Sequence, residues 1–506
     1  MKKLRIKNIK SFKDSGDLNI KPLTVFVGRN SCGKSSLLRF PVVLAQTRNT
    51  NTDSPLTFYG NMLDYGNYED VIHSGCNDGM EFEIHYDIDI NDTQDYRYIM
   101  VGEEVNNREN TNSDIRDVSL KIVIDKENKR TFVKSVQLFI DDNCLTGFFE
   151  KDGHYIISLS KLRVNEQLIS ADYEFQLKEL FFDDFFPLYE ERELFPSIVD
   201  SVRKKNNSNE NCSSQDLYNK LFVNASPYGD DSLTPEEDEI KTIKKSLDYA
   251  STIMSHVYNR LDFESKILTY IGPFRANPER TYRDSERRSI NVGVKGENTS
   301  TVLIRDYQND KRLIDKISEW LHNTMNYRLS INEIGSSLYQ IVLEDDKGNI
   351  SNIIDVGYGV SQVLPIITQV IRSAYVTKKS LKNSSMENDE MILIEQPELH
   401  LHPAAQADLA DLFVDCIKKK SNKKIIIETH SEHIIRKLQV LIADKNNSFT
   451  NKDICIYYVD KDQNGVATVE EMRLLENGKF EKPWPSGFFD KAHQLSMELL
   501  RNSSIG

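Results

Sequence analysis

Apolar and polar positions alternate along the first thirty residues, a spacing that is typical of strands with one buried face. The apolar positions of this stretch are Leu4, Ile6, Ile9, Leu18 and Ile20. A continuous apolar run over residues 23–27 follows and leads directly into a glycine loop. The pattern predicts a strand, a return strand and a buried strand that ends at the loop. Similar β-like runs continue at Phe82–Tyr86, Val118–Ile124 and Phe132–Ile140.

A helical pattern replaces this alternation over residues 172–265. The run Thr234-Pro235-Glu236-Glu237 is a favourable helix start, with a capping residue, a proline in the first position and a glutamate three residues after the cap. Behind it an apolar stripe steps by three and four residues: Ile240, Ile243, Leu247, Ala250, Met254, Val257 and Leu261. Such a stripe indicates either a packed helical hairpin or a short dimer-forming coil. Strands and helices then alternate to the end of the chain, which indicates an α/β protein.

The glycine loop matches a nucleotide-binding pattern. Residues 28–35 read Gly-Arg-Asn-Ser-Cys-Gly-Lys-Ser, which fits G-x-x-x-x-G-K-[ST] between an apolar strand and a helix-like run over residues 36–46. Backbone N–H groups of such a loop, and the positive end of the new helix, hold phosphate oxygens. We expect Lys34 to reach the β and γ phosphates and the Ser35 hydroxyl to ligate Mg²⁺. The predicted nucleotide-binding residues are Gly28, Arg29, Asn30, Ser31, Cys32, Gly33, Lys34, Ser35 and Ser36.

Two later apolar runs each end in a carboxylate. Residues 391–394 are apolar and are followed by Glu395. Residues 424–430 contain a second apolar run and end in Glu428, Thr429 and His430. A buried parallel strand has this pattern, and its terminal carboxylate would lie beside the phosphate loop. We therefore expect Glu395 to hold Mg²⁺, directly or through water, and His430 to contact the γ-phosphate.

The chain resembles the ABC-class ATPase heads of SMC, RecF and overcoming-lysogenization-defect proteins over residues 1–50 and 350–435. Residues 395–403, Glu-Gln-Pro-Glu-Leu-His-Leu-His-Pro, look like the acidic-strand motif and D-loop of stand-alone bacterial AAA-family ATPases. Thr429-His430-Ser431 is similar to their switch-histidine motif, and residues 270–275 and 484–490 resemble further segments of that group. The resemblance implies an α/β ABC-ATPase head, with a mixed sheet lobe, a P-loop core and an inserted helical subdomain. It also implies ATP and Mg²⁺ as cofactors.

Residues 355–362 lie where the ABC signature is expected, but the usual first serine is missing before Gly357-Tyr358-Gly359. Backbone N–H groups at this helix start could still bind a γ-phosphate across a dimer, with Ser361 as a helper. The resemblance therefore implies a head-to-tail homodimer with two sandwiched nucleotides. An ordinary loop before a helix is the alternative.

The residue after the Mg²⁺ carboxylate is normally a glutamate that positions the attacking water, and here it is Gln396. An amide orients water but cannot accept its proton. Glu398 and His430 are the alternative catalytic groups, beside Glu395 and Gln396. We expect a weak but real ATPase activity.

Pattern and resemblance together predict four parts. Residues 1–165 form the N-terminal part of the head, with the P-loop and a β-rich lobe, and residues 166–265 form the helical insertion. Residues 266–440 form the C-terminal part of the head, and residues 441–506 form a β-hairpin and tail.

Composition narrows the class further. The net charge of −14 over 506 residues argues against a surface that coats DNA, although a local basic patch remains open. No run approaches the ~20 apolar residues that span a bilayer, and the first residues lack the apolar core of a signal peptide. Six scattered cysteines without a C-x-x-C pair fit a reducing cytoplasm.

Other patterns favour structure over chemistry. Residues 460–465 with Glu471 fit a calcium-loop pattern, but the flanks look like strands, so we expect a hairpin turn. Acidic residues lie between the members of an arginine cluster, which favours a solvated face or internal ion pairs over a site for nucleic acid or for a partner's carboxylates. The arginines are Arg275, Arg280, Arg283, Arg287 and Arg288. Trp484 is expected to dock the tail onto the core.

No nuclease motif is visible, so the expected function is an ATP-gated dimer that senses or regulates a separately encoded effector, a nuclease or toxin. The resemblance suggests a role in antiviral defence. A RecF-like ATPase that clamps DNA and an ATP-dependent scaffold without turnover are the alternatives.

Overall fold

The computed structural model describes residues 1–90, 114–160, 163–164, 167–168, 173–177, 180–188, 191–206, 212–223, 233–284, 291–335, 337–375, 389–419, 423–485 and 498. It divides into two compact units. The first unit contains Met1–Leu18 and Val43–Ser265, and the second contains Asn19–Val42 and Lys266–Gly506. The predicted division into four parts stays a prediction.

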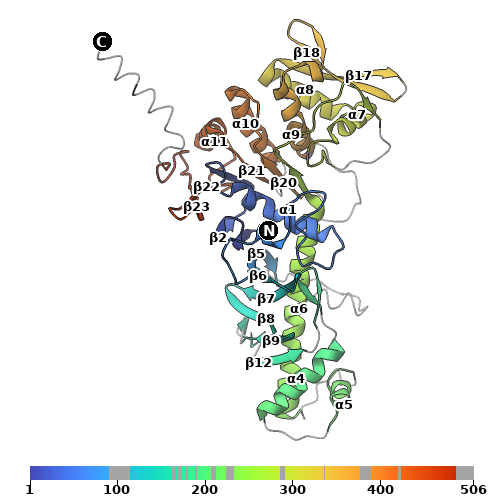
Figure 1. Ribbon diagram of the computed structural model, residues 1–506, viewed down its shortest axis with the longest axis vertical. Helices are drawn as coiled ribbons and strands as arrows, with labels where there is room; N and C mark the ends of the chain where they lie inside the picture. The colour runs from blue at the N-terminus through green and yellow to red at the C-terminus, as the bar shows by residue number, and fades with distance from the viewer. Residues whose placement is uncertain are drawn as a thin grey trace. The chain divides into compact units, whose positions relative to one another are not determined.

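A large antiparallel sheet dominates the first unit, in the order β12-β9-β8-β7-β6-β5-β1-β2, with β3 beside β1 (Figure 1). Its strands are β1 (Lys3–Ile9), β2 (Phe12–Asp14), β3 (Leu18–Asn19), β5 (Met80–Asp89), β6 (Ile115–Glu127), β7 (Arg130–Ile140), β8 (Asn143–Lys151), β9 (His154–Leu159) and β12 (Tyr173–Leu177). The β-like runs expected from the sequence lie within β5, β6 and β7, which confirms them.

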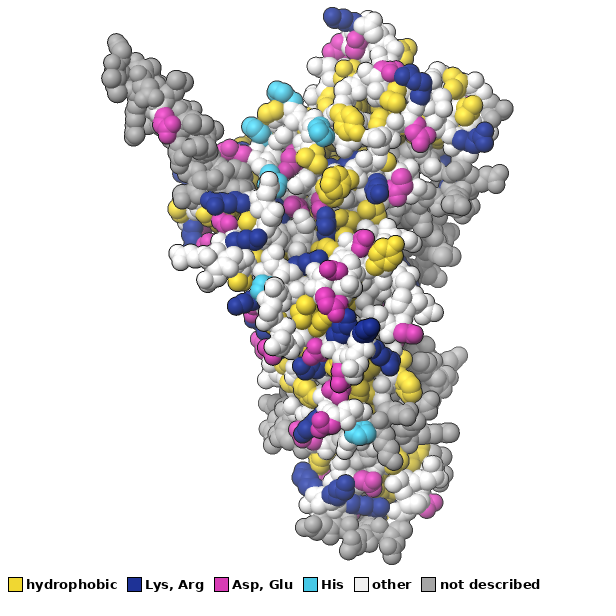
Figure 2. Space-filling model, in the orientation of Figure 1, with side chains coloured by type: hydrophobic (Ala, Val, Ile, Leu, Met, Phe, Trp, Pro, Cys, Tyr) yellow, Lys and Arg dark blue, Asp and Glu magenta, His cyan; other side chains and the backbone are white. Residues whose placement is uncertain are grey.

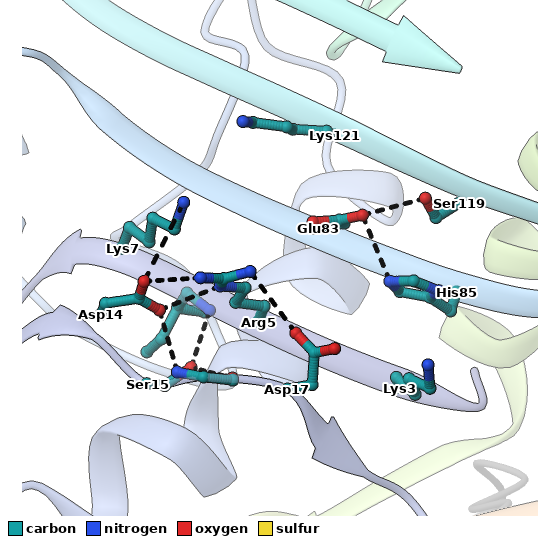
Figure 3. A network of polar contacts seen from close by, with 12 residues as sticks. Lys3, Arg5, Lys7, Asp14, Ser15, Asp17, Glu83, His85, Ser119 and Lys121 are labelled. Carbon is teal, nitrogen blue, oxygen red and sulfur yellow. Dashed lines mark hydrogen bonds and ion pairs between the residues drawn. The ribbon is translucent and has the colours of Figure 1, made fainter. Parts of the chain in front are cut away.

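Opposite faces of this sheet have opposite character because successive side chains of a strand alternate. Leu4 and Ile6 of β1 are buried, whereas Arg5 between them lies on the polar face, where it pairs in register with Glu83 of β5. Figure 3 shows this face, where the guanidinium of Arg5 donates two hydrogen bonds to Asp14, at 2.9 and 2.7 Å. Cross-strand ion pairs of this kind fix the register of the sheet.

The helical part begins later than the sequence pattern indicated. Residues 173–188 contain β12, β13 (Phe181–Asp183) and β14 (Phe186–Leu188), and the helices start with α4 (Glu191–Asn206). The expectation of helix from residue 172 was therefore wrong. Buried and exposed residues alternate along β12, and β12 pairs with β9 at the edge of the large sheet. The pairing with β9 provides backbone partners that helix periodicity does not reveal.

The remaining short elements of the first unit are α2 (Tyr68–Val71), β10 (Arg163–Val164), β11 (Gln167–Leu168), α5 (Ser214–Tyr218) and a π-helical turn (Asn219–Val223). The long helix α6 (Pro235–Ile267) begins where the capping pattern predicted. The Glu237 N–H donates to Thr234 Oγ1 at 3.3 Å, and the Thr234 N–H donates to Glu237 Oε2 at 3.1 Å, a reciprocal capping box. All seven residues of the apolar stripe are buried, so packing within the chain accounts for the stripe.

A six-stranded sheet forms the centre of the second unit, in the order β15-β20-β21-β4-β22-β23. Its strands are β4 (Leu23–Gly28), β15 (Leu268–Ile271), β20 (Glu390–Glu395), β21 (Lys423–Glu428), β22 (Ile454–Lys461) and β23 (Ala467–Glu471). All neighbours are parallel except β22 and β23. Every residue of β4 is buried, as expected for a parallel strand covered on both faces.

Helices α1 (Lys34–Arg48), α7 (Thr299–Asn309), α8 (Arg312–Met325), α9 (Tyr358–Tyr375), α10 (Pro403–Lys419) and α11 (Glu432–Ala443) complete the α/β arrangement (Figure 1). A smaller antiparallel sheet contains β16 (Tyr282–Arg283), β17 (Tyr327–Gly335), β18 (Leu338–Asp345) and β19 (Ile350–Asn352), followed by a 3-10 turn (Ile353–Asp355). The expected α/β class, with a separate β-rich lobe and inserted helices, is confirmed.

Two minor expectations are also confirmed. Strands β22 and β23 form an antiparallel hairpin, and the Gly465 N–H donates to Asp462 O at 3.0 Å within its turn. The Trp484 ring contacts Phe480 and Tyr458, at centroid distances of 4.8 and 6.1 Å. Within the described ranges, every helix is too short or too polar to cross a lipid bilayer.

Candidate functional site

Three neighbouring strands end at the same edge of the central sheet of the second unit. Parallel pairing aligns Glu395 of β20 with Glu428 of β21, and Glu428 with Phe26 of β4. Strand β4 then ends at Gly28, the first residue of the predicted phosphate loop. The carboxyl edge of an open parallel sheet is where ligands of α/β proteins bind. Motifs that lie hundreds of residues apart in sequence therefore meet at one edge.

The loop has the backbone geometry of a tight turn into a helix. Gly28 has φ +146°, and a Cβ there would lie 2.0 Å from the Val459 carbonyl oxygen, so only glycine fits. Ser31 and Gly33 also have positive φ, at 61° and 108°. Helix α1 begins at Lys34, and the Ser36 and Leu37 N–H groups both donate to the Gly33 carbonyl, at 2.9 and 3.3 Å. The tight turn of the loop thus leads directly from the end of β4 into the start of α1.

Lys34 and Ser35 both contact Glu428. The Ser35 hydroxyl donates to Glu428 Oε2 at 2.6 Å, and Lys34 Nζ lies 3.9 Å from Oε1. Lys34 Nζ also donates to the Arg29 carbonyl at 2.6 Å. Burial raises the pKa of Glu428, and burial lowers the pKa of Lys34 while the Glu428 carboxylate opposes that shift. The sequence reasoning did not select Glu428 as a site residue; its only signal was its position at the end of the second apolar strand.

Side chains of Arg39 and Tyr270 hold the Glu395 carboxylate. Arg39 of α1 donates to both carboxylate oxygens, at 2.5 and 2.7 Å, and the Tyr270 hydroxyl donates to Oε1 at 2.6 Å. The Glu395 side chain is 2% exposed and the Arg39 side chain 25%. Proximity to the Glu395 charge adds to burial in raising the pKa of Tyr270. Sequence reasoning also missed Arg39.

A buried arginine fixes the backbone after β20. Arg275 donates to the carbonyl oxygens of Glu395, at 2.6 Å, and of Gln396, at 3.1 Å. Gln396 has φ +45°, and its N–H donates to the Glu428 carbonyl at 2.8 Å. A left-handed conformation in a residue other than glycine needs such support from its surroundings. The segment of residues 270–275, which resembled a recurring segment of the family, contains Arg275 and therefore orients the loop that follows Glu395.

Glu398 and His430 form a second pair at this edge. The backbone N–H of His430 donates to Glu398 Oε1 at 2.6 Å, whereas Glu398 Oε2 is buried and has no hydrogen-bond partner within the described residues. Burial raises the pKa of Glu398. Burial and the nearby Lys34 charge lower the pKa of His430 to about 4, against a hydrogen bond to the Gly28 backbone. The imidazole is therefore neutral at pH 7 and lies against the first residue of the loop.

The signature-like segment begins α9 as expected. Tyr358 is the first helical residue, and a Cβ at Gly359 would lie 2.7 Å from the His400 carbonyl, whereas Gly357 has no atom within 4 Å. The exposed Tyr358 ring contacts the His400 ring at a centroid distance of 5.4 Å. Ser361 is buried, and its hydroxyl donates to the Tyr358 carbonyl at 2.9 Å. The predicted signature residues and the predicted D-loop therefore lie side by side.

The arginine cluster divides into different roles. Arg275 is buried at the acidic loop, and Arg280 makes two hydrogen bonds with Asp355, at 2.9 and 2.6 Å, on the surface. Arg280 thus fits the expected solvated face, whereas Arg275 binds backbone carbonyls instead of the carboxylates of an internal ion pair. Arg287 and Arg288 lie outside the described residues.

The donor set fits a magnesium nucleotide. A hydroxyl and two carboxylates, Ser35, Glu395 and Glu428, are hard oxygen ligands of the kind Mg²⁺ prefers. Among the described residues no group of three His, Cys, Asp or Glu side chains is arranged to hold a metal ion by itself. Mg²⁺ in nucleotide sites takes only one or two protein oxygens and completes its shell with phosphates and water. The residues present therefore match the ligand that the motif implies.

Fold and site together define a P-loop α/β nucleotide-binding domain. The chain belongs to the AAA ATPase domain family, whose sequence model matches residues 1–435. A second model, for a protein of unknown function (DUF3696), matches residues 450–499. The predicted class of AAA-family ATPase is therefore confirmed. No curated protein is significantly similar to the chain.

Several solved structures of SMC head domains are similar over most of their length. An SMC head bound to the C-winged helix domain of ScpA is 12% identical, with a TM-score of 0.39 over 94% of this chain and 97% of that chain. An SMC head with an extended coiled coil, derived from Pyrococcus furiosus, is 11% identical, with a TM-score of 0.38 and 98% of each chain covered. The head from Thermotoga maritima is 9% identical, with a TM-score of 0.35, covering 94% and 99%. The family assignment rests on the sequence model, because these scores are low.

Proposed function

We propose that this AAA-family ATPase binds Mg-ATP at residues 28–36 and hydrolyses it slowly. The observation that supports the proposal is the meeting of Lys34, Ser35 and Glu428 at the start of α1, with Ser35 Oγ 2.6 Å and Lys34 Nζ 3.9 Å from the carboxylate. An ammonium and a hydroxyl at a helix N-terminus suit a triphosphate and its metal. When phosphate enters, it competes with Glu428 for both groups.

Each residue has a defined task in this proposal. Lys34 and the loop N–H groups neutralise phosphate oxygens, and neutral His430 donates a hydrogen bond toward the terminal phosphate. Ser35 and Glu395 are the predicted metal residues, and Mg²⁺ would stabilise the negative charge that develops on the phosphates. Hydrogen bonds from Arg39 and Tyr270 orient the Glu395 carboxylate.

The proton of the attacking water needs an acceptor, and Gln396 cannot provide one. Glu398 is the better candidate, because its pKa is raised by burial and its Oε2 has no hydrogen-bond partner within the described part of the chain. A carboxylate with a raised pKa is a stronger base. We therefore assign Glu398 as proton acceptor and Gln396 as the group that orients water. The resulting activity is weak because these two tasks, usually those of one glutamate, are divided.

The test is phosphate release at saturating Mg-ATP. Wild type should exceed background, Lys34→Ala should fall to background, and Glu398→Gln should lower the rate by about 10²-fold or more. Gln396→Glu should raise the rate above wild type. Equal rates for wild type and Lys34→Ala would remove the activity claim, and an unchanged rate for Glu398→Gln would remove its assigned role.

The predicted head-to-tail homodimer belongs to the same proposal. Gly357 and Gly359 would offer backbone N–H groups of α9 to a nucleotide bound by a second chain. Ser361 would act indirectly, because its buried hydroxyl already donates within the first turn of α9. Tyr358, at this helix start, is 53% exposed and is therefore available for such a contact. Light scattering should show a doubled mass with a slowly hydrolysed ATP analogue, and Lys34→Ala should stay monomeric.

The wider role is an ATP-gated regulator of a separately encoded effector, a nuclease or toxin, in antiviral defence. This part rests on the resemblance of the motifs described above. Purification of the chain with the products of its genomic neighbours tests it, and the absence of an ATP-dependent complex would count against it. Direct DNA clamping is less favoured, because acidic and basic side chains are interspersed over the face in Figure 2 and the net charge is −14. Salt-sensitive DNA binding by the purified chain would favour the DNA-clamping role over the effector-regulating role. Assembly that needs ATP but does not hydrolyse it would favour a scaffold.

A further inference from the structure

The first unit contains a cavity of about 990 Å³ that none of the motifs accounts for. Its wall is made by the segment after α1 (residues 49–55), the ends of the β6–β7 and β8–β9 hairpins, and the β13–β14 hairpin. This volume is within the range of ligand pockets, about 300–1,000 Å³, and the cavity is open to solvent. The cavity can therefore accept a large ligand or a segment of another protein.

A polar network around the buried Arg48 lies in its wall. Arg48 is 7% exposed, forms an ion pair with Asp184 and donates to the Tyr258 hydroxyl at 2.5 Å. The Tyr258 hydroxyl donates in turn to Asp183 Oδ2 at 2.6 Å. The Arg48 guanidinium also lies 4.3 Å from the centre of the Tyr258 ring. Its positive charge is thus satisfied by carboxylates of the chain itself, and the arginine does not provide an anion site.

The remaining lining is acidic and aromatic. The lining carboxylates are Asp53, Glu127, Glu150, Asp183 and Asp184, against two arginines, Arg48 and Arg130. This difference leaves three negative charges in excess. Asp53 and Glu127 are exposed lining residues and take part in no ion pair within the described residues. Aromatic rings lie beside them: Phe181 is 63% exposed, and Phe182 packs on Tyr155 at a centroid distance of 5.2 Å.

Carboxylates and aromatic faces together bind ammonium and guanidinium groups, through ion pairing and cation–π attraction. We propose that this cavity is the docking site for a lysine- or arginine-bearing segment of a partner protein. A segment fits better than a single small cation, because the carboxylates come from separate turns and the volume exceeds that of one side chain. The exposed Phe181 would cover the apolar stem of a long basic side chain. The cavity lies wholly in the first unit, so this inference is independent of the nucleotide chemistry.

The test is fluorescence anisotropy with a labelled octalysine peptide and the full chain. Phe181→Ala should weaken binding about three- to tenfold. The double variant Asp53→Asn/Glu127→Gln should weaken it about tenfold or more. The matched controls remove equally exposed groups of the same unit that do not line the cavity. They are Tyr59→Ala, and Asp142→Asn/Glu174→Gln, which changes the net charge by the same amount.

The control variants should bind within about twofold of wild type. Equal losses in cavity and control variants would indicate attraction to the net charge alone, and would overturn the proposal. So would octaglutamate binding as well as octalysine, or no binding of octalysine to wild type. Spermidine is also tested as a competitor of the labelled peptide. If it displaces the peptide at a concentration equal to the peptide's dissociation constant, the site binds small cations, and the proposal of a protein segment as occupant is contradicted. Because all substituted side chains are exposed, thermal melts should match wild type and show that each variant is folded.

Discussion

The ion pair between Arg39 and Glu395 allows a sharp test of how the acidic strand is held. Arg39→Ala removes both of its hydrogen bonds to a carboxylate that is 2% exposed, and among the described residues leaves that carboxylate the Tyr270 hydroxyl as its side-chain partner. Breaking a buried pair by removal of one partner costs about 3–5 kcal/mol. Because the Arg39 side chain is 25% exposed, we expect a loss near the lower limit, about 3 kcal/mol.

The matched control is Arg280→Ala. Arg280 also makes two hydrogen bonds with one carboxylate, that of Asp355, but the two side chains are 59% and 48% exposed. Solvent screens such a pair, so its removal should change the urea midpoint little. The geometry of the two pairs is similar and their burial differs, which isolates the effect of burial.

Urea unfolding followed by tryptophan fluorescence is the suitable assay. Both tryptophans, Trp320 and Trp484, belong to the second unit, which also contains both ion pairs. The double variant Arg39→Ala/Glu395→Gln should recover part of the stability, because it leaves no unpaired buried charge. Equal midpoints for Arg39→Ala and Arg280→Ala, or no recovery in the double variant, would refute the reasoning.

The pKa of His430 and two glycines of α9 give further tests. Burial lowers the pKa of His430 from 6.5 to about 4. Between pH 6.5 and pH 4 the unfolded chain therefore binds more protons at His430 than the folded chain does. The folded state consequently loses stability as the pH falls through this range. His430→Gln should therefore flatten the urea midpoint between pH 6.5 and 4, and an unchanged profile would contradict this assignment. Gly359→Ala should lower the midpoint because its Cβ would lie 2.7 Å from the His400 carbonyl, whereas Gly357→Ala, with no atom within 4 Å, should not. Equal midpoints for these two variants would contradict the packing described for α9.

Local signals made the phosphate loop predictable. The apolar strand before Gly28, the G-x-x-x-x-G-K-[ST] spacing and the helix start at Lys34 all lie within some fifteen residues, so a single window of sequence contains them. The strands ending at Glu395 and Glu428 were similarly visible as apolar runs. The capping box of α6 was predictable for the same reason.

The contacts that complete the site join distant parts of the chain. Ser35 and Glu428 are 393 residues apart, and Arg39 and Glu395 are 356 apart. The local sequences around these residues do not predict which carboxylate contacts Ser35 and which contacts Arg39. The order of strands in the sheet determines these pairs, because β21 lies between β20 and β4. The strands of residues 173–188 were missed for a related reason, since they are short and depend on partners elsewhere in the fold.

The central claim is that the start of α1 binds a nucleotide. Calorimetric titration of Mg-ATP into the wild-type chain and into Lys34→Ala tests it most directly. Lys34 is 3% exposed and contacts the loop carbonyl of Arg29 and the carboxylate of Glu428, so a circular dichroism spectrum must first show that the variant is folded. We predict saturable binding to the wild type, at one Mg-ATP per chain, that is lost in Lys34→Ala. The same heat of binding in both proteins, or none in the wild type, would contradict the claim.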